Sequence, residues 1–164
     1  MNNELVKEAV QALSIHEVRL HKANAFIATD YEPLFPTVEQ FGLQARQAVI
    51  ERSYLNVKSN DDEEHEFFRA RYQCAFRLVP DNLPPETLQN NEEMKKLILA
   101  EVTAEFMAIY AVAESKPSED ALIEFCKFNV GYHVWPYWRE YASSTATRLR
   151  LPPVVLPLYK IPNG

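Results

Sequence analysis

The stretch WPYWREYASSTATRLRLPPVVL, Trp135–Leu156, decides the fold that this sequence predicts. Pro136 suits the first turn of a helix, where its missing N–H has no intrahelical partner to lose. The positions of one helical face follow Trp135 at spacings of three and four residues: Trp138, Ala142, Thr145 and Leu149. The Leu-Pro-Pro sequence that comes next cannot continue a helix, so we expect the helix to end near Arg150.

Upstream of this stretch the sequence predicts a sheet for the helix to cover. Four segments have strand-like patterns, and they span residues 15–29, 44–58, 67–79 and 97–112. In the third, apolar and polar residues alternate from Phe68 to Leu78, which is typical of an antiparallel sheet with one buried face. The fourth is apolar at every second position from Ile98 to Val112, which favours a strand over a helix. The alternation of the first decays after Lys22, which predicts a bulge.

A further helical signal begins at Ser118, a predicted N-cap followed by two acidic residues. We expect Gly131 and Pro136 to kink or break the helix that starts there. Residues 1–13 predict a short amphipathic helix or a loosely ordered arm, and residues 151–164 predict an extended, proline-rich tail. Strands grouped before helices indicate an α+β fold, in which a four-stranded antiparallel sheet is covered by a long, kinked C-terminal helix.

The composition limits the classes of function. The 164 residues suit one domain, 1–164, and their net charge of −6 without a run of Lys or Arg argues against nucleic-acid binding. No window of about 18 apolar residues is present, so we expect no membrane insertion, and the acidic N-terminus is unlike a secretory signal. Cys74 and Cys126 predict buried, reduced thiols of a cytoplasmic protein, with a disulfide as the alternative.

The sequence lacks the motifs that carry catalysis or hold cofactors. The histidines, which belong to no HExxH motif, are His16, His21, His65 and His133. There is no GxSxG motif and, with three glycines, no glycine-rich phosphate loop. The acidic run at residues 61–66 lacks the glycine and spacing of a calcium-binding loop and predicts a solvated turn. We therefore expect no catalytic residue, no metal and no cofactor; an enzyme that uses His133, Arg139 or Glu140 is the third hypothesis for function.

Residues 30–43 form a predicted loop that is rich in large apolar side chains. Pro33, Pro36 and Gly42 exclude a regular element through most of it. Its large apolar residues are Tyr31, Leu34, Phe35, Val38 and Phe41. Since connecting loops run over the surface, these side chains either pin the loop to the core or form an exposed patch for another chain.

The C-terminal helical region has more aromatic residues than one apolar stripe can hold. They are Phe125, Phe128, Tyr132, Trp135, Tyr137, Trp138 and Tyr141. A single sheet offers the helix one face to cover, so the surplus predicts a second apolar surface. That surface lies either between subunits or against a client.

The order Pro136-Tyr137-x-Arg139-Glu140, followed by Leu-Pro-Pro-Val-Val-Leu-Pro, resembles the late helix of the SecB family of export chaperones. The order of the predicted elements is similar to that family over residues 15–157. The resemblance implies a four-stranded antiparallel sheet backed by a long helix, with subunits that pair through the first strand and the helices into a dimer of dimers. It also implies that non-native polypeptides bind in apolar grooves lined by sheet, helix and the loop after the first strand.

The resemblance also implies roles for individual residues. It assigns client binding to Tyr31, Leu34, Phe35, Val38, Phe41, Trp135 and Trp138. It assigns the contact with the SecA motor to Leu99 and Glu101, and the oligomer interface to Val18, Leu20, Tyr137 and Tyr141. Exporting members of the family carry acidic residues in the first strand for the motor, whereas this chain has Lys22, Ala23 and Asn24 there. Delivery to SecA therefore does not follow, and an antitoxin is the alternative partner.

We thus predict a cytoplasmic homo-oligomer, a dimer or tetramer, that acts as an ATP-independent holdase for unfolded polypeptides in protein export or toxin–antitoxin control. The alternative is a small-molecule or lipid-binding α+β domain, in which the helix closes over a cupped sheet. A closed cavity within one subunit would favour that alternative, whereas an open groove would favour the holdase.

Overall fold

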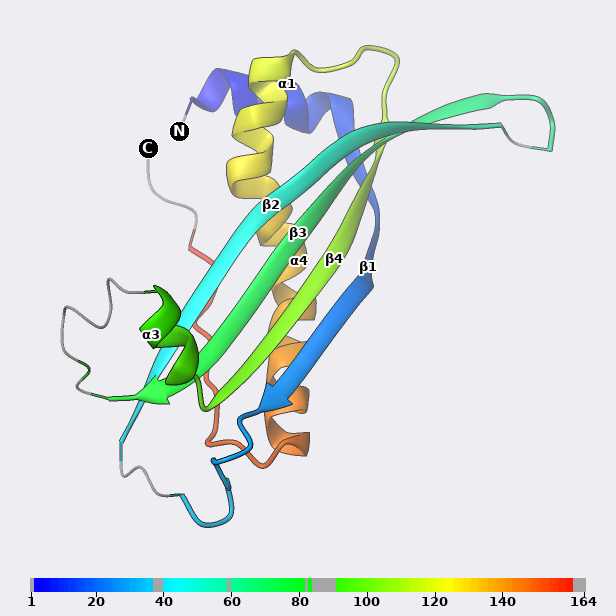
Figure 1. Ribbon diagram of the computed structural model, residues 1–164. Coiled ribbons are helices and arrows are strands. Elements are labelled where there is room, and N and C mark those ends of the chain that lie inside the picture. Colours follow the sequence, from blue (N-terminus) through cyan, green and yellow to red (C-terminus); the bar gives the residue numbers. More distant parts are fainter. Residues whose placement is uncertain (1, 37–39, 59, 82, 84–90, 161–164) are drawn as a thin grey trace.

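The computed structural model describes residues 2–36, 40–58, 60–81, 83 and 91–160. Within these residues, four strands form one antiparallel sheet in the order β1-β4-β3-β2. The strands are β1 (Leu13–Ile27), β2 (Phe41–Lys58), β3 (Glu64–Pro80) and β4 (Ala100–Val112). Figure 1 shows the long helix α4 (Glu119–Arg148) lying across one face of the sheet, while the opposite face is open over most of its length. The predicted α+β architecture is confirmed.

The core lies between α4 and the two central strands. The predicted apolar face of β3 is buried at every second position from Phe68 to Leu78. β4 contributes Ala100, Ala104 and Ala108, which are fully buried and whose small side chains let the helix approach closely. Burying each large core side chain contributes about 1.5–3 kcal/mol. Since a slip by one residue would turn these side chains to the other face, their burial also fixes the register of the sheet.

The first strand forms one edge of the sheet, and β2 forms the other. β1 pairs with β4 along its whole length, with register shifts between Ile15 and Glu17 and between Leu20 and Lys22. The second shift lies where the sequence pattern predicts a bulge. Both edge strands are long, and their outer N–H and C=O groups have no strand partner within the described part of the chain.

β4 begins at Ala100 rather than at residue 97, because the residues before it follow a helix that the sequence pattern does not predict. This helix, α3 (Asn91–Lys96), has acidic residues in its first turn and basic residues in its last, which suits the helix dipole. Met94 is almost fully buried and anchors α3 at one end of the open face of the sheet (Figure 1).

The N-terminal residues form helix α1 (Asn3–Ala12), which packs against the first half of α4. Two hydrogen bonds join the helices. The Ser118 N–H donates to Glu8 Oε1 over 2.6 Å, and the Asn2 N–H donates to Glu124 Oε2 over 3.1 Å. Ser118 is also the N-cap of α4, as the sequence predicts.

The expected break in the long helix does not occur, since α4 continues through both Gly131 and Pro136. Pro136 is exposed, and Trp138, two residues further on, is buried against the sheet. Gly131 lies where two hydroxyl groups approach the helix: an added Cβ would be 2.3 Å from Tyr159 Oη and 2.6 Å from Tyr72 Oη. Tertiary packing therefore overrides the local preference to end the helix.

After α4 the chain reverses direction. The Leu151 N–H donates to the Ala146 carbonyl and the Arg150 N–H to the Thr147 carbonyl, which is the hydrogen-bond pattern of a Schellman motif. Arg150 takes the left-handed conformation that this motif requires, with a φ of 53°. Residues 151–160 then run back along α4 without helix or strand (Figure 1).

Candidate functional site

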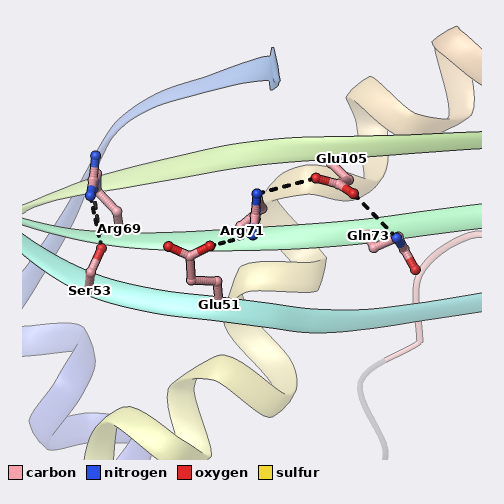
Figure 2. A network of polar contacts seen from close by, with 6 residues as sticks. All are labelled: Glu51, Ser53, Arg69, Arg71, Gln73 and Glu105. Atoms are coloured by element: carbon pink, nitrogen blue, oxygen red, sulfur yellow. Dashed lines mark hydrogen bonds and ion pairs between the residues drawn. The ribbon is translucent and has the colours of Figure 1, made fainter. Parts of the chain in front are cut away.

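The open face of the sheet carries a network of polar and charged side chains. Figure 2 shows its members: Glu51, Ser53, Arg69, Arg71, Gln73 and Glu105. Arg71 forms an ion pair with Glu51 of β2, and its Nη1 lies 3.6 Å from Glu105 Oε2 of β4. Gln73 Nε2 donates to the other oxygen of Glu105. These cross-strand pairs make the middle of the open face polar, so it offers no apolar site for a client.

A depression of about 400 Å³ lies where α3 meets this open face. Its charged lining residues are Arg46, Arg77, Lys95 and Glu101. Lys95 is paired with Glu92 of α3, whose Oε1 lies 2.7 Å from its Nζ, so the charges at this end of the face are mixed. The resemblance places the motor contact here. Glu101 lines the depression, and Leu99 is half-buried, with its main chain bonded to Leu78 and Ala28.

The loop after β1 divides its apolar residues between core and surface. Tyr31 is buried and packs edge-on against the half-buried Phe41, with ring centroids 6.0 Å apart. Leu34 and Phe35 are 58% and 74% exposed. Glu32 holds both in a turn, because its carboxylate accepts from the Leu34 N–H and its carbonyl from the Phe35 N–H. Each of the two sequence interpretations thus describes part of the loop. Val38, the remaining loop residue assigned to client binding, lies outside the described residues.

The two tryptophans of α4 have different surroundings. Trp138 is 1% exposed and packs against Phe76 of β3, with ring centroids 6.1 Å apart, so it belongs to the core. Trp135 is covered by the C-terminal segment. Its Nε1 donates to the Pro157 carbonyl over 2.8 Å, and its ring lies 5.5 Å from that of Tyr159. A client would therefore reach Trp135 only after the segment moves, and Trp138 offers it almost no surface.

The residues assigned to an oligomer interface lie on the edge strand and on the helix. Val18 and Leu20 of β1 are opposite Ala108 and Phe106. Since these two residues of β4 face α4, Val18 and Leu20 point to the same side. Leu20 is exposed and Val18 is half-buried. On α4, Tyr137 is exposed, and Tyr141 is half-buried and stacked on Trp138. The edge strand and the helix thus present exposed apolar side chains on the same side of the sheet.

The groups considered for catalysis do not converge. His133 contacts the rings of Tyr110, Phe125 and Tyr132, while Arg139 and Glu140 are exposed. Among the described residues, no three His, Cys, Asp or Glu side chains lie close enough to hold a metal ion. None of the helices described is both long and apolar enough to cross a membrane.

The cysteines agree with the sequence interpretation, since Cys74 and Cys126 are both free and buried. Burial raises the pKa of the Cys74 thiol to about 12 and that of Cys126 to about 11. Both therefore stay protonated at neutral pH, and neither is a reactive thiolate.

Comparison with known proteins identifies the fold. No protein-family model matches the chain, and no curated protein matches its sequence. Among solved structures, it is similar to the Mycobacterium tuberculosis Rv1957 SecB-like chaperone, described in complex with a ChAD peptide from the Rv1956 HigA1 antitoxin. The TM-score is 0.69, and the match covers 98% of this chain and 99% of that chain at 19% sequence identity. This chain has the SecB-like fold. At this identity the likeness establishes the fold alone.

The SecB-like fold brings together three residues that the sequence did not predict to meet. Tyr72 of β3, Gly131 of α4 and Tyr159 of the C-terminal segment meet at one point. Gly131 carried a usable signal, because a glycine inside a continuous helix often marks a close approach of another group. Nothing in the sequence indicated that the group would come from the chain's own C-terminal segment.

Proposed function

We propose that this protein is an ATP-independent holdase chaperone that binds non-native segments of other polypeptides. The observation that carries the proposal is the pair Leu34 and Phe35, which the turn at Glu32 holds in the open. An exposed apolar pair on a fixed turn presents surface for an unfolded chain. Each large apolar client side chain buried on binding would contribute about 1.5–3 kcal/mol, and binding of the unfolded state needs no nucleotide.

We further propose a cytoplasmic homo-oligomer, a dimer or tetramer, that associates through the outer surfaces of β1 and α4. The residues we assign to this interface are Val18, Leu20, Tyr137 and Tyr141. The support is the unpaired edge of β1 together with the exposed apolar side chains beside it, because long exposed edge strands readily pair with another chain. Several sites on one particle would add their weak contacts through effective concentration.

For the partner, we favour a specific client such as an antitoxin segment over delivery to the SecA motor. The similar structure from Mycobacterium tuberculosis holds an antitoxin peptide, and the first strand of this chain has Lys22, Ala23 and Asn24 where exporting members of the SecB family carry acidic residues. We expect no complex with purified SecA in gel filtration of a mixture. A co-eluting complex would reverse this preference and restore the motor contact at Leu99 and Glu101.

The proposal is tested by suppression of aggregation of a chemically denatured model protein in the absence of ATP. We expect the wild type to suppress aggregation, and the double variant Leu34→Ser/Phe35→Ser to lose at least half of that activity. Its free energy of unfolding should change by less than about 0.5 kcal/mol, because both residues are exposed. Val10→Ser, on exposed α1 surface, is the matched control and should retain full activity. A wild type without effect at several-fold molar excess would contradict the holdase proposal.

The alternative of a small-molecule or lipid-binding domain predicts an enclosed cavity. The depression beside α3 and a second one of about 340 Å³ between β2 and α4 are both open to solvent. Neither favours the alternative over the holdase.

A further inference from the structure

The C-terminal segment, residues 151–160, lies on the fold as an extended peptide lies in a groove. It contains no helix or strand, and after Leu151 no backbone–backbone hydrogen bond joins it to the other described residues. Side chains hold it instead. Leu151 and Leu156 are buried, whereas Val155 and Leu158 are 80% and 72% exposed. Anchored side chains separated by free ones are typical of a bound peptide.

The groove that holds this segment lies between α4 and the strands β2 and β3. The Trp135 indole donates to the main-chain carbonyl of Pro157, and the Tyr159 ring packs beside it. The Tyr159 hydroxyl meets α4 at Gly131, where the hydroxyl of Tyr72 of β3 also approaches the helix. Because the indole N–H binds a main-chain carbonyl, it can bind a peptide with any side chain at that position. This contact therefore selects an extended backbone rather than a particular side chain.

Prolines explain why the segment can lie there without a ladder of hydrogen bonds. Pro152, Pro153 and Pro157 have no N–H group, so three backbone donors that would need a partner are absent. An incoming peptide with the same extended shape would meet the same indole donor and the same apolar surfaces that bury Leu151 and Leu156.

The groove continues beyond the point where the described segment ends. The depression of about 340 Å³ adjoins Tyr159, and its lining residues are Gln47, Ala48, Val49, Tyr72, Cys126, Lys127 and Tyr159. Because it is open to solvent, a longer peptide has room to extend past the position of Tyr159 along β2 and α4.

We propose that this groove is a docking site for an extended, apolar segment of a polypeptide client, and that residues 151–160 are its resident occupant, which a client displaces. The inference rests on the proposed holdase function and gives that function a second surface besides Leu34 and Phe35. The fitting segment has apolar side chains spaced as Leu151, Leu156 and Tyr159 are, on an extended backbone that contains proline.

The experiment compares two double variants of the full chain in which the same chemical change is made at seated or at free positions. Leu156→Ser/Tyr159→Ser removes two side chains that pack in the groove and so weakens the binding of the C-terminal segment. Val155→Ser/Leu158→Ser changes only exposed side chains. The probe is a synthetic peptide, LPPVVLPLYK, with fluorescein at its N-terminus, and its Kd is measured by anisotropy. We expect the seated variant to bind at least tenfold more tightly than the wild type, and the control to bind like the wild type. Adding Trp135→Phe to Leu156→Ser/Tyr159→Ser removes the indole N–H and should reduce the gain in affinity for the peptide at least threefold.

The single variant Tyr159→Ser keeps the buried Leu156 in place. It is the control for misfolding of the double variant. Its far-UV circular dichroism spectrum should match that of the wild type, and its affinity for the peptide should shift in the same direction by a smaller factor. Equal affinity in all variants would overturn the proposal. The proposal would also be overturned if an unfolded, reduced model protein did not compete with the labelled peptide for the variant that binds it more tightly. Clients would then bind elsewhere on the protein. Suppression of aggregation by the wild type, measured separately, decides the holdase function in either case.

Discussion

The hydroxyl of Tyr110 lies 3.1 Å from Nδ1 of His133, and this contact joins the C-terminal end of β4 to α4. Burial raises the pKa of Tyr110, so the phenol keeps its proton at neutral pH. Burial also lowers the pKa of His133, which keeps the imidazole neutral. In the tautomer that carries its proton on Nε2, the neutral ring accepts from the phenol at Nδ1, and protonation of the ring removes that acceptor.

The burial of His133 makes the stability of the fold depend on pH in a defined direction. The folded pKa of His133 lies below the value of about 6.5 of an unfolded chain, so the unfolded state binds more protons in that window. Stability therefore falls as the pH drops through about 6.5 towards the folded pKa. Urea unfolding at pH 7.5 and 5.5 should show a larger loss for the wild type than for His133→Gln. The exposed His21→Gln should behave like the wild type, and an equal loss in all three proteins would contradict the assignment.

Trp138 is expected to act as a core residue. Trp138→Ala leaves a cavity against Phe76 and should lower the free energy of unfolding by about 3–5 kcal/mol. Arg139→Ala, at the exposed next position of α4, should change it by less than about 0.5 kcal/mol. Urea denaturation of both variants makes the comparison. A small effect at Trp138 combined with weaker client binding would instead favour a direct role in client contact.

The polar network on the open face is expected to stabilise the sheet through Glu105. This carboxylate is 13% exposed and lies between Arg71 and Gln73. Arg71→Leu leaves it without its cation and should destabilise the fold by about 1–3 kcal/mol. Adding Glu105→Leu should recover part of the loss, because the uncompensated charge is then gone. A double-mutant cycle from urea unfolding measures the coupling, and strictly additive effects would exclude an interaction between the two residues.

The edge strand β1 is expected to carry the oligomer interface. Leu20→Glu places a charge on its exposed apolar surface and should reduce the solution mass measured by light scattering. Val10→Glu, equally exposed on α1, is the control and should keep the wild-type mass. A wild type with the mass of a single chain would refute the proposed interface at once.

The sequence predicted the sheet because apolar residues recur at every second position of β3 and β4, which favours a strand. Strict alternation from Phe68 to Leu78 allows one buried face, and the structure buries it. At Gly131 and Pro136 the expected break does not occur, because the local preference for ending a helix is worth only a few kcal/mol. The packing of Trp138 on the sheet outweighs it, and no local pattern reports such packing.

The candidate site could be predicted only in part for a related reason. Helical spacing placed Trp135 and Trp138 on the same face, but it could not indicate which would be covered by the core and which by the C-terminal segment. Similarly, the apolar loop residues were visible in the sequence, while the division between buried Tyr31 and exposed Phe35 depends on the turn that Glu32 forms. Contacts between residues far apart in the chain decide both cases.

Gly131→Ala provides a test because helix propensity and packing predict changes of opposite sign in the free energy of unfolding. In an exposed helix interior, this change stabilises by about 1 kcal/mol. Here the added Cβ would lie 2.3 Å from Tyr159 Oη and 2.6 Å from Tyr72 Oη, so overpacking should instead destabilise by about 1–3 kcal/mol. The penalty should shrink in a Tyr159→Ser background, because one of the two obstructing hydroxyls is then gone. Gly42→Ala is the control, since its nearest contact would be Val79 Cγ2 at 3.3 Å, which a shift of a few tenths of an ångström relieves. If urea unfolding showed Gly131→Ala to be more stable than the wild type, the C-terminal segment would not be seated against α4 as described.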